Sequence, residues 1–245
     1  GYAFHGCKSL VAVTIPNSID VIEYYTFAYC DSLKSIIIPN SVKTIEDYAF
    51  GYCDNLEIVT MGFGLTTIGN YSFFSCEKLN KIDVNENNKC YSNDEYGVLF
   101  NKDKTILVKY PMGNKNDKYI IPSSVISIGD CAFYECKYLE NFILPQGLRL
   151  IGNWSFAECE RLTKISIPNS VMSIGKNAFY GSANLTNVYY NSTEKNWNNI
   201  SISTGNEQLL HSYVHYIGCE GFVESIISPT CTEWGYTSCT CHCGY

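Results

Sequence analysis

Apolar residues recur along this chain with a fixed 23-residue period, interrupted by one longer interval near the middle. Each copy approximates L-x-x-I-x-I-P-x-S-V-x-x-I-G-x-x-A-F-x-x-C, so leucine, isoleucine and phenylalanine form three columns when the copies are aligned. The columns are Leu10, Leu33, Leu56, Leu79, Leu139, Leu162 and Leu185; Ile22, Ile45, Ile68, Ile128, Ile151 and Ile174; and Phe4, Phe27, Phe50, Phe73, Phe133, Phe156 and Phe179. One such copy is too short to bury its own apolar side, whereas stacked copies bury like residues against one another. The period therefore predicts a solenoid.

The first part of each copy reads as a short strand. In residues 35–38, Ile36 and Ile38 alternate with Ile37, and a period of two is typical of a strand that buries one face. Pro39 follows directly and ends the strand, because proline has no N–H to donate to a sheet. We expect Ile36 and Ile38 to point into the core and Ile37 to point outward.

The second part of each copy contains another extended segment and a compact turn. Residues 41–46 read as the extended segment, and Ala49, Phe50 and Cys53 then fall at positions i, i+1 and i+4, which predicts one inward-facing helical turn. A period of 20–29 residues with a leucine-rich core is the signature of a leucine-rich-repeat solenoid. We predict a mostly β fold over residues 1–189: a solenoid of 23-residue coils with a parallel sheet and one-turn helices.

One interval breaks the period. The separation of Phe73 and Phe133 is more than twice the usual one, and the excess falls around residues 96–111, where two apolar runs flank the polar sequence NKDK. Such a pattern predicts a β-hairpin. We expect a hairpin insertion at about residues 86–118 that loops out of the solenoid, with residues 119–124 rejoining the register.

The sequence after the last copy predicts a cover for the open end of the solenoid. Thr193 is a suitable N-cap for a short helix that contains Trp197, and residues 212–217 alternate as a strand does. We interpret residues 190–217 as a C-terminal cap, because the end of a solenoid exposes its core. Residues 218–245 contain a separate cysteine-rich segment, which we interpret as a small and incomplete module.

Composition narrows the possible partners. The 245-residue chain has a formal net charge of −7, which argues against nucleic acid and anionic membrane surfaces as partners, since both attract Lys and Arg patches. No apolar run approaches the ~18 residues that span a membrane.

The chain opens at Gly1 inside a copy of the repeat, so we expect it to be a fragment.

The repeated sequences resemble the BspA-like leucine-rich-repeat family. The resemblance rests on IPNSVKTIEDYAFGYC, IPSSVISIGDCAFYEC and IPNSVMSIGKNAFYGS, with YGVLFNKDKTILVKYP and EKNWNNISISTGNEQLL beside them, and covers residues 1–217. It implies a secreted or cell-surface protein used for attachment or partner binding. The expected partner is a protein or glycan on a host or neighbouring cell. The segment PTCTEWGYTSCTCHCG resembles a small cysteine-containing module of bacterial surface proteins.

Thirteen cysteines fall into two main groups. In the repeat, one column holds cysteine in most copies and Ser182 in the last. Such a column takes a small side chain, which favours buried free thiols, because free cysteine behaves as a small buried hydrophobe. Disulfides between adjacent coils are the alternative, since stacking distances permit them. This column holds Cys7, Cys30, Cys53, Cys76, Cys136 and Cys159. In the tail, Cys231, Cys239, Cys241 and Cys243 favour disulfides over zinc, because their spacing differs from the paired C-x-x-C of structural zinc sites.

Candidate catalytic chemistry is sparse. The sequence has no G-x-S-x-G, H-E-x-x-H or phosphate-binding loop. Its four histidines do not accompany a nucleophile motif, and the carboxylates vary from copy to copy. We predict that the protein is not an enzyme and needs no cofactor.

Aromatic residues form the candidate binding surface. In four successive copies, a tyrosine stands two residues before the phenylalanine of the column. In two of these copies, a second tyrosine follows four residues after the first. Residues i and i+4 of a helical turn share a face, and tyrosine and tryptophan are enriched at binding hot spots. The candidate partner-binding residues are Tyr25, Tyr29, Tyr48, Tyr52, Tyr71 and Trp154.

Two other interpretations of the surface stay open. The tyrosines can stack between coils for stability alone. The outward side of the first strands is a second candidate face, and its residues are Thr14, Ile37, Thr60, Asp83, Ile143, Ser166 and Tyr189. At the level of function, we predict adhesion; a passive spacer between other surface modules and an accessory binding domain of a larger surface enzyme are the alternatives.

Overall fold

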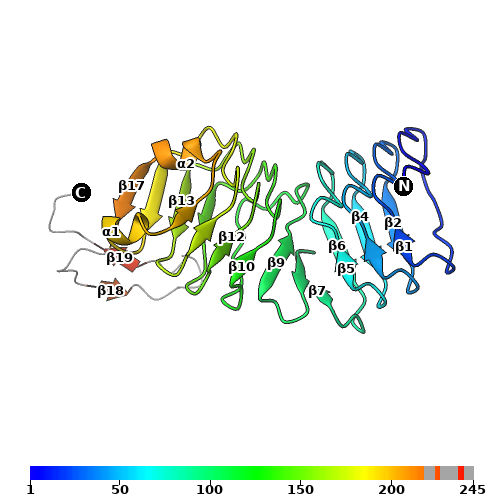
Figure 1. Cartoon of the computed structure of the whole chain (residues 1–245), viewed down its shortest axis with the longest axis horizontal. Coiled ribbons are helices and arrows are strands. Elements are labelled where there is room, and N and C mark those ends of the chain that lie inside the picture. Colours follow the sequence, from blue (N-terminus) through cyan, green and yellow to red (C-terminus); the bar gives the residue numbers. More distant parts are fainter. Residues whose placement is uncertain (218–223, 227–236, 240–245) are drawn as a thin grey trace.

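The structure, a computed structural model, describes residues 1–217, 224–226 and 237–239. The repeated coils stack along the long axis of the molecule, from the N-terminal coil to helices α1 and α2 at the other end (Figure 1). Most of the predicted module at 218–245, with Cys231, Cys241, Cys243 and the side chain of Cys239, lies outside the described residues. Its two described strands, β18 (Glu224–Ile226) and β19 (Thr237–Cys239), pair antiparallel. The mostly β solenoid is confirmed.

The predicted strand of each copy forms one parallel column, divided into two sheets. The N-terminal sheet holds β2 (Ser35–Ile38), β4 (Ile58–Met61) and β6 (Lys81–Val84). The C-terminal sheet holds β11 (Asn141–Ile143), β13 (Lys164–Ile167), β15 (Asn187–Tyr190) and β17 (Tyr213–Tyr216). Side chains alternate as predicted: Ile36 and Ile38 are buried, and Ile37 between them is exposed.

The second extended segment forms two-residue strands, again in two sheets. The N-terminal one contains β1 (Val21–Ile22), β3 (Thr44–Ile45) and β5 (Thr67–Ile68). The other runs through β16 (Ser201–Ile202), β14 (Ser173–Ile174), β12 (Leu150–Ile151) and β10 (Ser127–Ile128) to β9 (Ile106–Lys109), β8 (Leu99–Asn101) and β7 (Tyr91–Asn93). The N-terminal sheet ends at β5, where the Ile68 amide donates to the side-chain hydroxyl of Tyr91 in β7 instead of to a backbone carbonyl.

Phenylalanine rings stack through both halves of the core. Neighbouring rings such as Phe27 and Phe50 lie nearly parallel with centroids 5.3 Å apart, and Phe133 and Phe156 lie 5.1 Å apart. The predicted leucine, isoleucine and phenylalanine columns therefore form the core of the solenoid, except that Phe4 in the first coil is exposed and Leu10 and Ile68 are partly buried.

The segment predicted as a helical turn is instead a pair of turns with left-handed residues. Tyr48 and Tyr52 have φ of 56° and 59°, so the backbone leaves the helical region at both positions. Ala49, Phe50 and Cys53 still point inward and are fully buried. The predicted inward residues are therefore correct, but the predicted helical conformation of the backbone is wrong.

Hydrogen bonds cross each boundary between coils in both directions. In the strand columns the later coil donates, as when the Glu46 amide bonds the Ile22 carbonyl at 2.9 Å. In the turns the earlier coil donates, as when the Phe27 amide bonds the Ala49 carbonyl at 2.8 Å. The left-handed residues turn their amides along the solenoid axis, so the turns form a ladder of their own.

The cysteine column completes this ladder with side chains. The thiol of Cys53 donates to the Phe27 carbonyl of the previous coil at 3.1 Å, and the thiols of Cys30, Cys76 and Cys159 make the equivalent bond. Ser182 donates to the Phe156 carbonyl at 2.7 Å, which explains why serine replaces cysteine there. The thiols of this column are free and buried except that of Cys7, which is exposed in the first coil.

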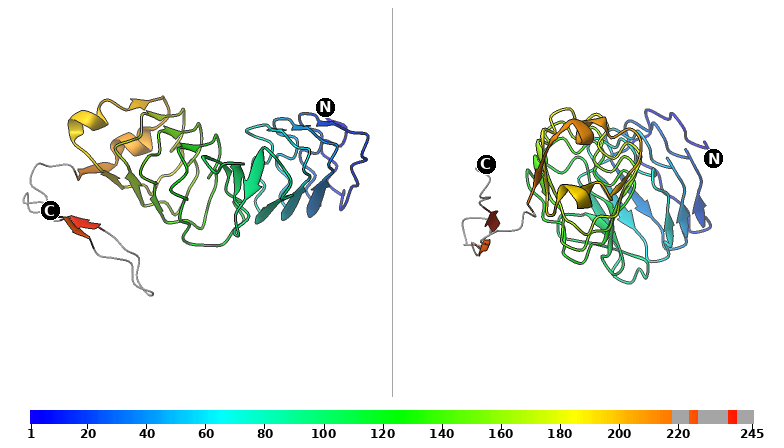
Figure 2. Two further views of the ribbon diagram at one scale, coloured as in Figure 1. Left: turned by 90° about the horizontal axis from the view of Figure 1, so that it is seen from below. Right: turned by 60° about the vertical axis from the view of Figure 1, so that its left-hand side comes forward.

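The insertion contains the predicted hairpin, since β8 and β9 pair antiparallel. The prediction that it loops out of the solenoid is wrong. Val98, Phe100 and Leu107 are buried in the core of the C-terminal coils, whereas Leu99 belongs to the core of the N-terminal coils. Successive side chains of a strand point to opposite faces, so β8 stands as a partition between two apolar cores. Figure 2 shows the solenoid continuing on both sides of it.

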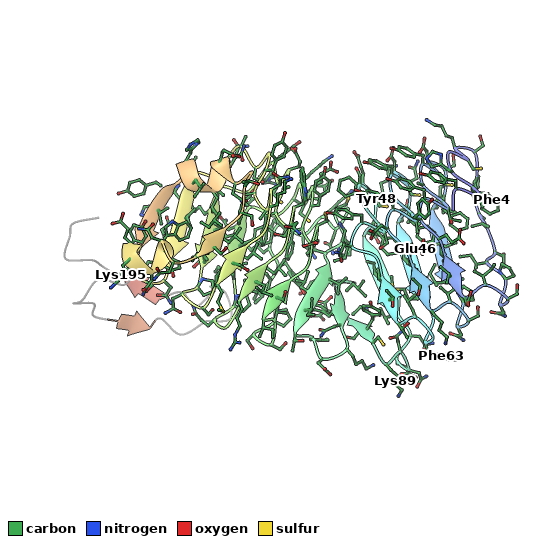
Figure 3. The ribbon with its side chains drawn as sticks, viewed as in Figure 1. Phe4, Glu46, Tyr48, Phe63, Lys89 and Lys195 are labelled. Atoms are coloured by element: carbon green, nitrogen blue, oxygen red, sulfur yellow. The ribbon has the colours of Figure 1, made fainter. Side chains whose placement is uncertain are left out.

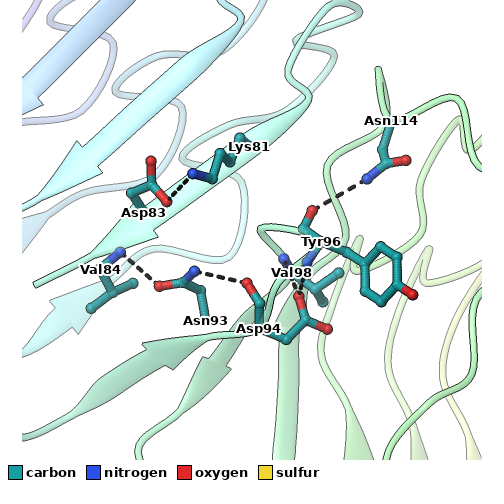
Figure 4. A network of polar contacts seen from close by, with 8 residues as sticks. All are labelled: Lys81, Asp83, Val84, Asn93, Asp94, Tyr96, Val98 and Asn114. Carbon is teal, nitrogen blue, oxygen red and sulfur yellow. Dashed lines mark hydrogen bonds and ion pairs between the residues drawn. The ribbon is translucent and has the colours of Figure 1, made fainter. Parts of the chain in front are cut away.

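Polar contacts fix the insertion against β6 (Figure 4). Asn93 accepts a hydrogen bond from the Val84 amide at 2.9 Å, and one Asp94 oxygen accepts from the amides of Tyr96 and Val98. Gly97 has a φ of 72° and lies so close to β6 that a Cβ would stand 2.7 Å from the Lys81 side chain. Only glycine allows this approach.

The C-terminal segment adds a strand to each column and two short helices. Helix α1 (Glu194–Trp197) is capped by Thr193, as predicted, and Trp197 is buried beneath it. Helix α2 (Glu207–His211) follows, and β17 confirms the predicted strand. Figure 2 shows both helices across the end of the coils. The interpretation of residues 190–217 as a separate cap remains a prediction.

Candidate functional site

The candidate site lies on the side of the solenoid formed by the turns. We call this side the turn flank and define it as residues 1–9, 23–32, 46–55, 69–78, 129–138, 152–161 and 175–184. Two positions in most of these segments are left-handed. The first holds Tyr2, Tyr25, Tyr48, Cys131, Trp154 and Asn177, and the second holds Gly6, Tyr29, Tyr52, Ser75, Glu135, Glu158 and Gly181. Glycine at two of the second positions marks the backbone requirement, because it adopts this conformation without strain.

Tyrosines at the first position form a continuous stack. The rings of Tyr2, Tyr25, Tyr48 and Tyr71 lie within 8° of parallel, with centroid distances of 5.2, 5.0 and 5.1 Å. Each interior ring therefore has a neighbour on both faces, while its edge stays partly accessible to solvent.

A second stack lies beside the first. Tyr29 and Tyr52 are parallel within 5° at a centroid distance of 4.5 Å. The small residues Ala28 and Gly51 are buried between the two stacks. A Cβ on Gly51 would lie 3.3 Å from the ring of Tyr48, so the ring leans over the small residue. We call Tyr2, Tyr25, Tyr29, Tyr48, Tyr52 and Tyr71 the tyrosine ribbon.

Four aromatic residues missed by the sequence analysis extend this surface. They follow the phenylalanine column directly: His5, Phe74, Tyr134 and Tyr180. Phe74 contacts the edges of Tyr48 and Tyr52, with centroids 5.7 and 5.5 Å away. The column itself was a usable signal, because it carries either an aromatic residue or a small one.

Trp154 does not belong to the tyrosine ribbon. Cys131 takes the stacking position in the coil between them, and Trp154 reaches Tyr134 only edge-on, at 6.5 Å between centroids. Phe74 and Tyr134 stack at 4.3 Å and carry the aromatic surface past the insertion. The structure thus groups the five predicted tyrosines, whereas Trp154 lies beyond the insertion and meets Tyr134 and Tyr180 without joining the stack.

Burial governs the acid–base chemistry of the ribbon. Partial burial is the largest cause that raises the pKa of Tyr48 to about 12, and the neighbouring Tyr25 and Tyr71 add smaller contributions. Burial likewise raises the pKa of Tyr25 and Tyr71, with smaller contributions from Asp47. The phenols therefore stay protonated at neutral pH and act as hydrogen-bond donors.

The buried cysteines carry no accessible reactivity. Burial raises the pKa of Cys76 and of Cys159 to about 12, and a thiol needs to ionise to act as a nucleophile or metal ligand. Within residues 1–217 and the two described tail strands, no group of three His, Cys, Asp or Glu side chains is arranged to hold a metal ion.

The outward side of the N-terminal sheet is the second candidate face. Ile37, Thr60 and Asp83 stand in register across β2, β4 and β6. Ile37 and Ile143 are 69% and 68% exposed, which confirms that these residues point outward. A shallow groove of about 390 Å³ lies at the ends of the three strands, between Ile37, Asp83 and neighbouring asparagines. It holds no buried polar group aimed at a ligand.

Side-chain positions separate the two candidate faces. Figure 3 shows Tyr48 toward the upper side of the solenoid, Glu46 nearer the middle, and Phe63 and Lys89 at the lower side. The residues that line the groove are all outside the turn flank.

The sequence matches the family described as "BspA type Leucine rich repeat region" in six copies, over residues 1–97 and 112–223. Among solved structures it is similar to a leucine-rich cell surface protein of Faecalibacterium prausnitzii, at 28% identity and a TM-score of 0.54 over 81% of this chain and 64% of that one. It is also similar to a leucine-rich repeat protein of Bacteroides ovatus, at 29% identity and a TM-score of 0.53 over 77% of this chain and 51% of that one.

The pneumococcal vaccine antigen PcpA shares the fold, at 22% identity and a TM-score of 0.56 over 77% of this chain and 58% of that one. The chain thus spans between half and two thirds of these three proteins. No curated protein sequence matches it. Within the residues that the structure describes, no helix has the length and apolar character to cross a membrane.

Proposed function

Because this chain belongs to the BspA-type leucine-rich-repeat family, we propose that it is a non-enzymatic adhesion protein of the cell surface. Its partner is a macromolecule on a host or neighbouring cell. The relatives named as a cell surface protein and a vaccine antigen support this location, and the family suggests a binding role.

The tyrosine ribbon is the proposed contact surface. The observation that carries this proposal is the placement of tyrosine at the left-handed positions of Tyr48 and Tyr52; Gly6 and Gly181 occupy the site of Tyr52 in other coils. A non-glycine residue there costs about 1–2 kcal/mol. The chain accepts this cost and gains a surface of partly exposed aromatic edges, the residue type enriched at hot spots.

The stacking favours a protein partner over a glycan. Sugars stack on free ring faces, but the faces of Tyr25 and Tyr48 are occupied by neighbouring rings at about 5 Å. The ribbon instead offers ring edges and phenolic hydroxyls, which suit carbonyl groups and charged side chains of a polypeptide.

The same stacking supports one alternative, a spacer in which tyrosines only brace the coils. Parallel aromatic pairs contribute about 0.5–1.5 kcal/mol each beyond their buried area. In that case the ribbon stabilises the solenoid and contacts no partner, and the molecule serves to hold other modules apart.

Two double variants distinguish adhesion from bracing. Tyr25→Phe/Tyr48→Phe keeps the stack and removes two hydroxyls, whereas Tyr25→Ala/Tyr48→Ala removes three stacked contacts. We expect the alanine variant to lose about 2–4 kcal/mol of unfolding free energy in urea. We expect the phenylalanine variant to keep its stability but to attach less to cultured epithelial cells and to bacterial cells.

The control is Ile37→Ser, on the opposite candidate face, which should attach normally. Cells treated with protease should lose attachment of the unmodified protein, and cells treated with glycosidases should keep it. Full attachment by both tyrosine variants would favour the spacer. Loss after glycosidase treatment alone would identify a glycan partner.

A further inference from the structure

Acidic residues are concentrated beside the tyrosine ribbon. Segments 23–32 and 46–55 of the turn flank contain five carboxylates and no lysine or arginine. The whole turn flank holds ten carboxylates and five basic side chains, so it carries a formal charge of −5 of the chain total of −7. The five carboxylates are Glu23, Asp31, Glu46, Asp47 and Asp54.

These carboxylates stand on both sides of the tyrosines. Glu46 and Asp47 directly precede Tyr48, and Asp54 follows shortly after Tyr52. Asp47 lies near enough to Tyr25 and Tyr71 to contribute, after burial, to raising the pKa of both phenols. Asp47 and the phenols of Tyr25 and Tyr71 therefore lie on one surface.

The charge of this surface is only partly neutralised within the chain. Lys8 pairs with Asp31 at 3.4 Å. Among the described residues, no ion pair is formed by Asp47 or by Asp54. Burial and then the like charges of Asp31 and Glu77 raise the pKa of Asp54, and Lys8 and Lys78 offset only part of this rise.

We propose that the partner segment bound by the tyrosine ribbon is a basic, extended polypeptide. Its lysine or arginine side chains pair with Glu46, Asp47 and Asp54, and its backbone carbonyls accept from the tyrosine hydroxyls. The inference rests on the proposed function and names the chemistry of its partner. Charge complementarity of this kind steers association and weakens with salt.

The stacked coils set the length of that segment. Tyr2 to Tyr71 spans three steps of about 5 Å. An extended chain rises about 3.3 Å per residue, so a segment of roughly five residues covers the ribbon. A peptide more than twice as long is therefore sufficient as a probe.

The test uses a synthetic (Ser-Arg)6 peptide and isothermal titration of the full chain, with (Ser-Glu)6 as the negative probe. The variant Glu46→Gln/Asp47→Asn/Asp54→Asn removes three charges and keeps the hydrogen bond that Glu46 accepts from the Tyr24 amide. The matched control, Glu86→Gln/Glu95→Gln/Asp103→Asn, removes three exposed carboxylates from the insertion, so both variants have the same net charge.

We expect the flank variant to bind (Ser-Arg)6 at least tenfold more weakly, and the control to change affinity less than twofold. Equal weakening by both variants would overturn the inference, because it would reflect net charge alone. So would absence of (Ser-Arg)6 binding at low salt.

Cell attachment separates this inference from the proposed function. If the flank variant attaches normally while Tyr25→Phe/Tyr48→Phe does not, the ribbon binds a partner that is not basic, and only the inference fails. If neither affects attachment, the proposed contact surface fails as well. If both weaken attachment and the insertion control does not, both statements stand.

Discussion

The coils before the insertion and the coils after it have the same kind of core and differ in their surface. Both halves stack phenylalanine at 5.1–5.5 Å, and both use a cysteine thiol to bond the previous coil. On the turn flank, the N-terminal half carries the tyrosine ribbon and its carboxylates, whereas the C-terminal half carries Trp154, Glu135 and Glu158. The repeat thus constrains inward positions, and the outward left-handed positions are free to differ.

Removal of the partition between the two halves should have the largest effect. We expect replacement of residues 98–109 by a short Gly/Ser link to abolish cooperative folding of the C-terminal coils. Val98, Phe100 and Leu107 are buried, and truncating such side chains costs about 2–5 kcal/mol each. The summed loss for the three side chains approaches the whole unfolding free energy of a domain, about 5–15 kcal/mol. Urea unfolding followed by circular dichroism measures it.

The control for this deletion is Ile106→Ser, in the same hairpin on a 39% exposed side chain, which should cost under about 1 kcal/mol. Unchanged stability after the deletion would mean that the coils close without the hairpin.

Matched core variants in the two halves test whether the halves unfold separately. Phe50→Ala and Phe156→Ala each remove a fully buried ring with a stacked neighbour on both sides. We expect each to cost about 3–5 kcal/mol. Since the two rings belong to different apolar clusters, each variant should shift mainly the transition of its own half in calorimetry. A single transition moved equally by both would show that the partition couples the cores fully.

The cysteine column gives a smaller difference between substitutions. Cys53→Ser should cost under about 1 kcal/mol, because Ser182 already makes the equivalent bond in the last coil. Cys53→Ala leaves the buried Phe27 carbonyl without this donor and should cost about 1–3 kcal/mol. Urea midpoints of the two variants measure the difference, and equal midpoints would show that the thiol bond contributes nothing.

The same thiols predict a pH dependence shared by both halves. Burial raises the pKa of Cys76 and of Cys159 from about 9 to about 12. Below about pH 9 both the folded and the unfolded thiols are protonated, so the stabilisation is complete. Between about pH 9 and 12 only the unfolded chain releases protons, so stability should fall as pH rises. Urea unfolding at pH 7.5, 9 and 10.5 measures this, and a flat profile would contradict it.

Substitutions on the exposed sheet face should have the smallest effect. Ile37→Ser and Ile143→Ser change outward side chains in the two halves, and such surface changes usually stay within about 0.5 kcal/mol. Neither should alter binding of the (Ser-Arg)6 peptide. Weaker binding by Ile37→Ser alone would move the contact surface to the groove beside it.

Periodicity predicted the core columns and both strand columns, because burial repeats with the sequence. It did not predict the place of the insertion. Tyr110 stands one repeat period before Phe133 and stacks on it, with ring centroids 5.4 Å apart, so the insertion fills a coil position. The phenylalanine column does not include this tyrosine. The polar NKDK loop of the insertion also suggested that the insertion is exposed.

The turn backbone was harder to predict. Tyrosine has no preference for left-handed φ, so Tyr48 and Tyr52 gave no local signal. Only Gly6 and Gly181, in the column of Tyr52, indicated what the backbone requires. The face-to-face stacking within the ribbon follows from the real turn geometry, and this geometry decides that ring edges rather than faces are presented.

The two-way hydrogen bonding between coils has a consequence for how such a molecule changes length. Coils on the same side of the insertion offer one another the same donors and acceptors, as the Glu46 and Phe27 amides do. Duplication or loss of one repeat unit would therefore leave no orphaned backbone group at the new boundary. Each event would move whatever the chain holds at its far end by 5.3 Å, the step between Phe27 and Phe50. The length of the solenoid can thus change in discrete steps during evolution, while every existing contact surface keeps its local structure.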